Sequence, residues 1–147
     1  MSETVVMSAS EVSDFLDEVF PQIHQNGRVY TVETIESSTA RVRYKAGEDS
    51  LRPGGTVSGP AIMALADFAA YVVILGHVGR QALAVTTNIN INYLRKAGPG
   101  DLICQARLLK LGKRLAVVDC LITTDQDEDA VIAQASATYS LPEARKA

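Results

Sequence analysis

The residue whose type and position most clearly suggest chemistry is Asp67. It is the only charged residue in the apolar run from Ala61 to Leu75. A carboxylate in such a run is costly unless a neighbouring group satisfies it or a reaction uses it. In a reaction it acts as a general base on water or attacks a carbonyl carbon itself. Otherwise it is a buried carboxylate bonded to backbone or hydroxyl groups, and the sequence leaves both interpretations open.

The start of the same apolar run offers a group that would complement this carboxylate. Pro60 suits the first turn of a helix, because its missing N–H removes no helix bond. Helix N-termini present free N–H groups and the positive end of the dipole. Since Pro60 has no N–H, the backbone N–H of Gly59 is the expected oxyanion-hole donor. The alternative for Gly59 is a close-packing or turn glycine.

The spacing of these two residues has a geometric consequence. Gly59 and Asp67 are eight residues apart, which is about 12 Å along one helix axis. They cannot both reach one carbonyl group from the same chain. If both are catalytic, Gly59 comes from one subunit and Asp67 from an antiparallel helix of the neighbouring subunit. A symmetric dimer would then hold two such sites.

The elements that position these residues follow from apolar periodicity and turn signals. Ser8 and Glu11 form a capping box at the start of an amphipathic helix over 8–20, which Pro21 ends. A central helix over 59–75 follows a Gly/Pro-rich loop over 47–59. Two strands with a turn at 36–38 are expected within 29–45. Four more strands are expected at 86–93, 101–111, 114–124 and 130–141. The tail over 142–147 is expected to be frayed.

This order of elements predicts the fold class. Short turns between strands imply an antiparallel sheet. One sheet wrapped around an apolar helix is the economical packing, and it gives an α+β fold in a single domain over 1–147. A length of 147 residues is about one domain.

The segment from Gly54 to Asp67 resembles the hotdog-fold acyl-CoA thioesterases of the phenylacetate-pathway (PaaI-like) group. Leu65-Ala66-Asp67 matches the Leu-Ala-Asp of that family, and Gly59 stands at the first glycine of its His-Gly-Gly. The resemblance covers roughly residues 29–141. It implies hydrolysis of an acyl-CoA to free acid and CoA, with CoA as part of the substrate and no further cofactor. It also implies a homodimer or a dimer of dimers.

Two more site residues follow from position within the resemblance. Thr86 lies where related enzymes place a Ser or Thr near the attacking water, although a threonine with ordinary β propensity is the alternative. Tyr71 lies one helical turn after Asp67 and would line the acyl pocket or serve as a core aromatic residue.

The sequence also departs from the family pattern. Ser58 stands in place of the usual histidine, and Pro60 in place of the second glycine. Arg52 stands where the family often has an asparagine near the water or carbonyl. Arginine cannot act as a base, but it binds carboxylates and phosphates. These changes indicate an acidic acyl group, a relocated CoA contact or a weak enzyme.

Cations near two turns suggest where the CoA phosphates would bind. Arg95 and Lys96 precede one turn, and Lys110, Lys113 and Arg114 surround another. In an antiparallel sheet these turns could meet at one rim and bind phosphates through charge-assisted pairs. The alternative is that they are merely solvated cations at strand ends.

Composition excludes several classes of protein. The net charge of −3 argues against a general nucleic-acid binder. The sequence has two cysteines and no Cys/His cluster, which argues against a disulfide scaffold and against a metal site. The first twenty residues are acidic, the reverse of a leader peptide, so we expect a cytoplasmic protein. The apolar run over 61–75 would reach about 22 Å, too short to cross a bilayer.

The sequence leaves two other functions open. The missing histidine and asparagine of the family pattern would fit a non-catalytic acyl-CoA-binding hotdog protein. A hydratase or dehydratase would use a histidine beside an acid. His77, ten residues beyond Asp67, and His24, ahead of the core, fit that role poorly.

Overall fold

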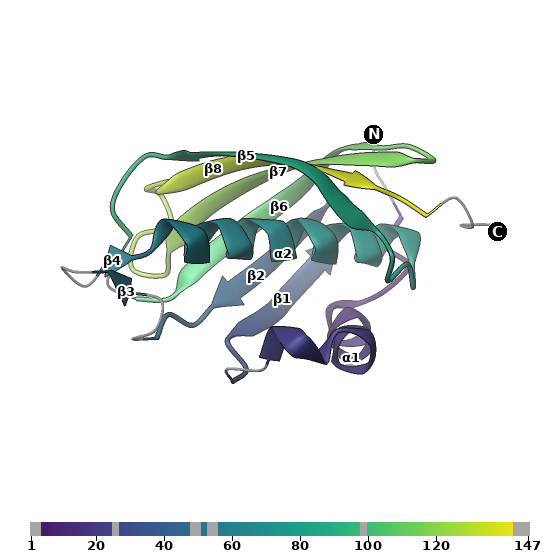
Figure 1. Cartoon of the computed structure of the whole chain (residues 1–147), viewed down its shortest axis with the longest axis horizontal. Helices are drawn as coiled ribbons and strands as arrows, with labels where there is room; N and C mark the ends of the chain where they lie inside the picture. The colour runs from purple at the N-terminus through teal and green to yellow at the C-terminus, as the bar shows by residue number, and fades with distance from the viewer. Residues whose placement is uncertain (1–3, 25–26, 48–50, 53–55, 98–99, 143–147) are drawn as a thin grey trace.

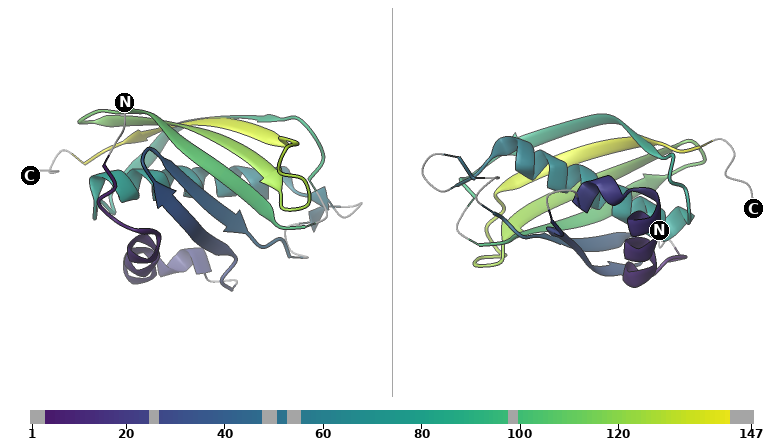
Figure 2. Two further views of the ribbon diagram at one scale, coloured as in Figure 1. Left: turned by 180° about the vertical axis from the view of Figure 1, so that it is seen from behind. Right: turned by 60° about the horizontal axis from the view of Figure 1, so that its bottom comes forward.

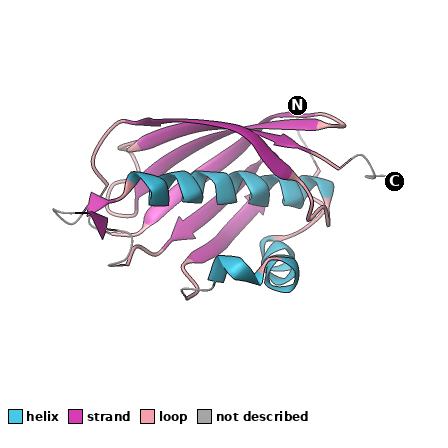
Figure 3. Ribbon diagram, viewed as in Figure 1, coloured by secondary structure: helices cyan, strands magenta, loops and turns pink. Residues whose placement is uncertain are grey.

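The computed structural model describes residues 4–24, 27–47, 51–52, 56–97 and 100–142. A six-stranded antiparallel sheet wraps around one long helix (Figure 1). This arrangement confirms the expected α+β hotdog architecture. Colouring by secondary structure shows both α-helices on the same side of the sheet (Figure 3).

The sheet is built from strands that are distant in sequence. Their spatial order is β1-β2-β6-β7-β8-β5. The strands are β1 (Tyr30–Glu36), β2 (Thr39–Tyr44), β5 (Val85–Tyr93), β6 (Leu102–Leu111), β7 (Leu115–Thr124) and β8 (Ala133–Ser140). All six lie within a few residues of the ranges expected from alternation.

The core helix α2 spans Gly59–Val78, three residues beyond the predicted end. Its 20 residues extend about 30 Å, so the length argument against a membrane span fails for the observed helix. Among the described residues it is the one helix long and apolar enough to cross a membrane. However, 72% of its most apolar window is buried inside the protein, so its apolar surface is used to pack the core.

The N-terminal helix α1 spans Ala9–Val19, and its capping box is confirmed. The Ser8 hydroxyl accepts from the Glu11 N–H at 3.2 Å, while the Glu11 carboxylate accepts from the Ser8 N–H at 2.9 Å. The helix buries Val12, Phe15 and Leu16. A short 3-10 helix, η1 (Pro21–His24), follows it. Figure 2 shows α1 lying beside the C-terminal end of α2.

Strand β5 is an edge strand, and this matters for the site. It pairs with β8 on one side, and no other described strand pairs with its free edge. The ladder shifts register between Thr86 and Asn88, so Thr87 is an extra residue in a β-bulge. Side chains of Ile89 and Ile91 are partly buried beyond the bulge, and Thr86 is partly buried before it. The bulge therefore turns Thr86 to the inner face, where strict alternation would have placed it outside.

Some expected segments differ from the structure or lie outside the described residues. The loop over 47–59 contains two short paired strands, β3 (Leu51–Arg52) and β4 (Thr56–Val57), that the sequence analysis did not predict. Residues 48–50 and 53–55 of this loop, 98–99 of the following turn and 143–147 of the tail lie outside the described residues.

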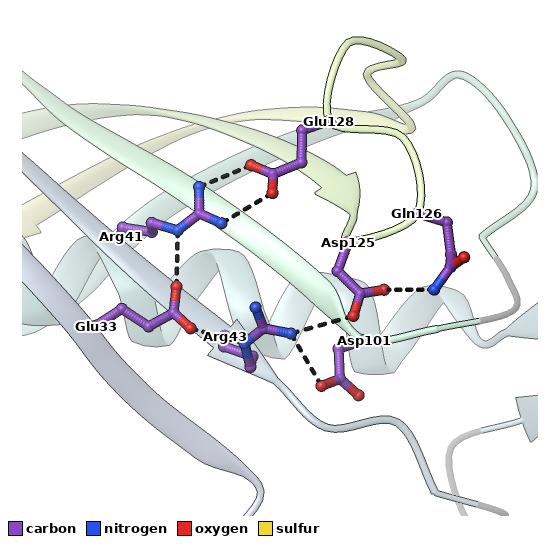
Figure 4. Close-up of polar contacts among 7 residues, drawn as sticks. All are labelled: Glu33, Arg41, Arg43, Asp101, Asp125, Gln126 and Glu128. Carbon is purple, nitrogen blue, oxygen red and sulfur yellow. Dashed lines mark hydrogen bonds and ion pairs between the residues drawn. The ribbon is translucent and has the colours of Figure 1, made fainter.

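The outer face of the sheet carries a network of ion pairs (Figure 4). Arg41 and Arg43 alternate along β2 with buried residues, so they point away from α2. Glu33 accepts from the Nε atoms of both arginines at 2.7 Å. Arg41 also makes a bidentate pair with Glu128 at 2.7 and 3.0 Å.

Arg43 extends the same network toward the loop after β7. Its Nη1 donates to Asp101 at 3.1 Å and to Asp125 at 3.2 Å. The network therefore ties β1 and β2 to the start of β6 and to the segment between β7 and β8.

Candidate active site

Asp67 lies on the side of α2 that faces β5 and β8, and its side chain is partly buried. Two hydroxyl groups hold one of its carboxylate oxygens. Thr86 Oγ1 donates to Asp67 Oδ1 at 2.6 Å, and the Tyr139 hydroxyl donates to the same atom at 2.6 Å. Among the side chains that the structure describes, no arginine or lysine pairs with Asp67. The carboxylate is thus positioned by neutral donors.

A pocket opens beside this carboxylate, with a volume of about 350 Å³. Asp67, Thr86 and Tyr139 form its polar side. The rest of its wall is mostly apolar and consists of Val19, Phe20, Tyr71, Ala82, Ala84 and Val85. An apolar cleft with a few convergent polar groups is the usual form of a small-molecule site.

Tyr71, which the sequence left open between a pocket residue and a core aromatic, is buried and lines this pocket. Its hydroxyl donates to the Ala82 carbonyl at 2.8 Å, which holds the segment before β5 against α2. Burial raises the pKa of Tyr71 above its ordinary value of 10.0. Its ring stacks on that of Tyr139 with centroids 6.0 Å apart.

The N-terminus of α2 leaves one N–H group in a suitable position. Ser58 is the N-cap, and its side chain accepts from the Ala61 N–H at 3.3 Å. Pro60 has no N–H, and no described residue accepts from the N–H of Gly59. The Tyr93 hydroxyl donates to the Gly59 carbonyl at 2.8 Å. Among the described residues, the Gly59 N–H therefore has no acceptor and lies at the positive end of the helix, where an oxyanion-hole donor would have to lie.

A second hollow, of about 460 Å³, lies around Gly59. Arg95 and Lys96 line it together with Tyr93 and Leu94. Both cations are exposed, so they are available to an anionic group bound near Gly59. Arg52 belongs to β3, where its backbone pairs with Thr56; its side chain lies outside the described part of the structure.

The two hollows lie at different ends of the same strand. Thr86 marks the Asp67 pocket at the start of β5, and Tyr93 marks the Gly59 hollow at its end. Within one chain Gly59 and Asp67 are thus held apart, each by its own contact with β5.

Comparison with known proteins decides the family. The sequence profile of the thioesterase superfamily matches residues 54–131, more than half of the chain. The chain belongs to the thioesterase superfamily. The matched region contains Gly59, Asp67 and Thr86, and it extends through Arg95 and Lys96.

Similar proteins agree with membership of this superfamily. A crystal structure of a predicted thioesterase from Silicibacter sp. TM1040 is 43% identical, covers 95% of each chain and superposes with a TM-score of 0.85. A Streptococcus mutans protein, solved bound to acetyl-CoA, is 25% identical with a TM-score of 0.68; the match covers 80% of this chain and 91% of that one. A predicted esterase of Saccharolobus solfataricus is 28% identical, over 78% of this chain and 73% of the other.

The two groups of cations that were expected to meet at one rim of the sheet lie far apart in the chain. Leu115 and Val85 both pair with Ser140, so the turn with Lys113 and Arg114 lies at the start of β5. Arg95 and Lys96 follow the end of β5, about 26 Å away along the strand. The expectation that the two turns could meet at one rim is therefore wrong within one chain, because the connection from β5 to β6 and the turn from β6 to β7 lie at opposite ends of the sheet.

Neither histidine forms an acid–base pair with Asp67. The Ser38 N–H donates to His77 Nε2 at 2.9 Å, so Nδ1 carries the proton that is donated to the Val73 carbonyl at 2.7 Å. His24 lies within 3.1 Å of Asp17. Within the described ranges, no group of three or more His, Cys, Asp or Glu side chains could hold a metal ion.

Tyr139 is the site residue that the sequence analysis missed. It ends an inward-facing row of Ala133, Ala135 and Ala137 on β8, where one large side chain follows three methyl groups. It is 4% exposed. That change in size within a regular alternation was the available signal, but the pairing of β8 with β5 was needed to place its hydroxyl beside Asp67.

Proposed function

We propose that this chain is an acyl-CoA thioesterase that hydrolyses an acyl-CoA to a carboxylic acid and free CoA. The observation that carries the proposal is the Asp67 carboxylate beside an apolar pocket, which two hydroxyls position and with which no described cation pairs. Membership of the thioesterase superfamily and the acetyl-CoA bound to the Streptococcus mutans protein favour a CoA thioester as the substrate.

The proposed site is shared between two copies of the chain. Asp67 and Gly59 are eight residues apart on one helix, about 12 Å along its axis, so one carbonyl needs Gly59 from a partner. The exposed residues Pro60, Met63 and Ala64 form a stripe on α2 ahead of Asp67. Together with the free edge of β5, this stripe offers a surface on which a second copy would pack.

Two-fold symmetry fixes where the axis of such a dimer would lie. If Gly59 of each chain meets Asp67 of the other, Met63, midway between them, lies on the two-fold axis. Gly59 is tied to Tyr93, and Asp67 is tied to Thr86. The same axis then passes between Ile89 and Asn90, the middle of this span on β5. In such a dimer the two β5 edges would run antiparallel to each other about this axis.

The same dimer would bring the two cationic turns together. In an antiparallel pair, the end of β5 in one chain lies beside the start of β5 in the other. Arg95 and Lys96 of one chain would then approach Lys113 and Arg114 of its partner. These side chains are exposed, and their charges suit the CoA phosphates.

The chemistry follows from these positions. Asp67 removes a proton from water that attacks the thioester carbonyl, or it attacks that carbon directly and forms a mixed anhydride that water then hydrolyses, which releases the acid and restores Asp67. Negative charge develops on the carbonyl oxygen, where the N–H of the partner's Gly59 stabilises it. The carbon–sulfur bond breaks, and CoA leaves as a thiolate that takes up a proton. The acyl group lies in the pocket lined by Val19, Phe20 and Tyr71.

The test is the substitution Asp67→Asn, assayed against a panel of acyl-CoA esters. Asparagine keeps the shape of the side chain but is neither a base nor a comparable nucleophile. We expect a loss of roughly 10²- to 10⁴-fold in turnover, the usual range for removing an acid–base group. Full turnover by a folded Asp67→Asn protein would overturn the proposed mechanism.

A matched control is Asp119→Asn. Asp119 lies on β7, alternates with buried residues and accepts from Gln134 at 2.9 Å on the outer face. Its turnover should equal that of the unmodified chain. If the unmodified chain binds CoA esters tightly but hydrolyses none of them, the chain is a non-catalytic binding protein and the proposed enzymatic function is wrong. The phenylacetate-pathway substrate type, the tetramer and the cytoplasmic location stay predictions.

A further inference from the structure

The Tyr139 hydroxyl lies within hydrogen-bond distance of two oxygens of Asp67. It is 2.6 Å from Oδ1 and 2.9 Å from the backbone carbonyl oxygen. A phenol has one proton to donate. The shorter distance falls in the range of charge-assisted O–H···O⁻ bonds, so the proton lies on the bond to the carboxylate.

Strand register makes Tyr139 and Thr86 a pair. They are direct cross-strand partners between β8 and β5. The bulge at Thr87 turns Thr86 inward, while Tyr139 points inward by regular alternation. Both hydroxyls therefore converge on the same carboxylate oxygen from adjacent strands.

This convergence distinguishes the two oxygens of Asp67. Oδ1 accepts both hydroxyl bonds. No described residue donates to Oδ2. A carboxylate held by two short bonds on one oxygen cannot rotate freely about its last torsion angle, so Oδ2 is the oxygen left for water or substrate in the pocket.

We infer that Tyr139 is a positioning residue that, with Thr86, holds Oδ1 of Asp67 and leaves Oδ2 as the reacting oxygen. The inference rests on the proposed thioesterase function. Tyr139 touches Asp67 and acts through it on the reaction, so its loss should lower turnover more than substrate binding.

The surroundings of Tyr139 suit a permanent donor. Burial, and next the negative charge of Asp67, raise the pKa of Tyr139 well above its ordinary value of 10.0. The phenol therefore keeps its proton at physiological pH. Stacking on Tyr71 holds the ring, so removing only the hydroxyl leaves the packing in place.

The test is Tyr139→Phe, with kcat and KM measured on the acyl-CoA that the unmodified chain hydrolyses best. We expect kcat to fall about 10- to 100-fold, the usual cost of losing a hydrogen bond to a charged group, with KM within about twofold. Tyr44→Phe is the control, since Tyr44 is also buried on the inner face, on β2. It should keep the kcat of the unmodified chain.

A second measurement separates positioning from a general structural effect. In the Asp67→Asn background, Tyr139→Phe should leave the residual rate unchanged, because its effect passes through the carboxylate. An unchanged kcat in Tyr139→Phe, a change in KM alone, or a full additional loss in the double variant overturns the inference. If Asp67→Asn itself keeps full turnover, the proposed function of Asp67 is wrong. If Asp67→Asn loses turnover but Tyr139→Phe does not, only the positioning role of Tyr139 is wrong.

Discussion

Carboxylates on the two faces of the sheet are held in opposite ways. On the outer face, Glu33 and Glu128 bond to guanidinium groups of Arg41 and Arg43 at 2.7 to 3.0 Å. On the inner side, Asp67 of α2 accepts only hydroxyl donors among the described side chains. Both arrangements fix a carboxylate in place, but only the outer one also neutralises its charge.

This difference suits the outer carboxylates to stabilising the fold and Asp67 to reacting with substrate. Burial alone would raise the pKa of Glu33, but hydrogen bonds and charge from Arg43 and Arg41 outweigh burial and hold it below its ordinary value of 4.5. Such a carboxylate is a poor base. Among the described side chains, only hydroxyl donors orient Asp67, and none of them carries a positive charge. The outer network is therefore expected to stabilise the fold, and the inner carboxylate to do the chemistry.

The largest effect outside Asp67 itself is expected at Gly59. Gly59→Pro removes the free N–H and is compatible with the first position of a helix. We expect kcat to fall about 10²- to 10³-fold, as when one oxyanion-hole donor is removed. Gly59→Ala is the control, because it keeps the N–H and adds a Cβ atom 3.3 Å from the Tyr93 hydroxyl. Equal losses in both variants would show that Gly59 matters for packing rather than for its N–H.

A smaller effect is expected at Thr86. Thr86→Val keeps the shape of the side chain but removes the donor to Asp67, and kcat should fall about tenfold. Thr87→Val provides the comparison, because Thr87 is its neighbour in the bulge and donates outward to the Thr138 carbonyl at 3.2 Å. Steady-state kinetics would give kcat for both variants. A lower kcat in Thr87→Val than in Thr86→Val would contradict the proposed role of Thr86.

On the outer face the effect should appear in stability rather than in activity. Arg43→Met leaves Asp101 and Asp125 without their cation and removes one of the two partners of Glu33. Since these groups are partly exposed, we expect a loss of about 1–2 kcal/mol in the free energy of unfolding. Turnover should not change. Arg107→Met, at an exposed position on the same sheet, should leave stability almost unaltered in a urea titration.

The pH dependence of stability gives the smallest and most specific signal. The folded-state pKa of Glu33 lies below 4.5, so its ion pairs contribute stability above about pH 4.5 that is lost as the pH falls through the folded value. The hydrogen bond from Arg41 lowers the pKa of Glu128 in the same direction. The melting temperature should therefore fall below about pH 4.5, and less steeply in Arg43→Met. Parallel curves would exclude this role of the network.

Local patterns in the sequence predicted most of the fold. The capping box at Ser8 and Glu11, and the alternation after Asn88, act within a few residues, so they are visible without the structure. The lone charge at Asp67 in an apolar run likewise marked the centre of the candidate site. These features depend on local geometry and on the cost of burying charge.

What the sequence did not reveal depends on long-range pairing. β5 crosses to pair with β8 rather than with the next strand, β6. That pairing places Tyr139 opposite Thr86 and sends the two cationic turns to opposite ends. The bulge at Thr87 is fixed by the same pairing. No spacing along the chain encodes these contacts, because each joins residues tens of positions apart.

The most direct test of the shared site mixes two inactive chains. Asp67→Asn and Gly59→Pro chains, carrying different affinity tags, are co-expressed, and mixed dimers are purified through both tags. Each mixed dimer holds one site with an intact Asp67 and an intact Gly59, so its turnover should be about half that of the unmodified dimer. Mixed dimers no more active than either parent would contradict a site built from Asp67 of one chain and Gly59 of its partner.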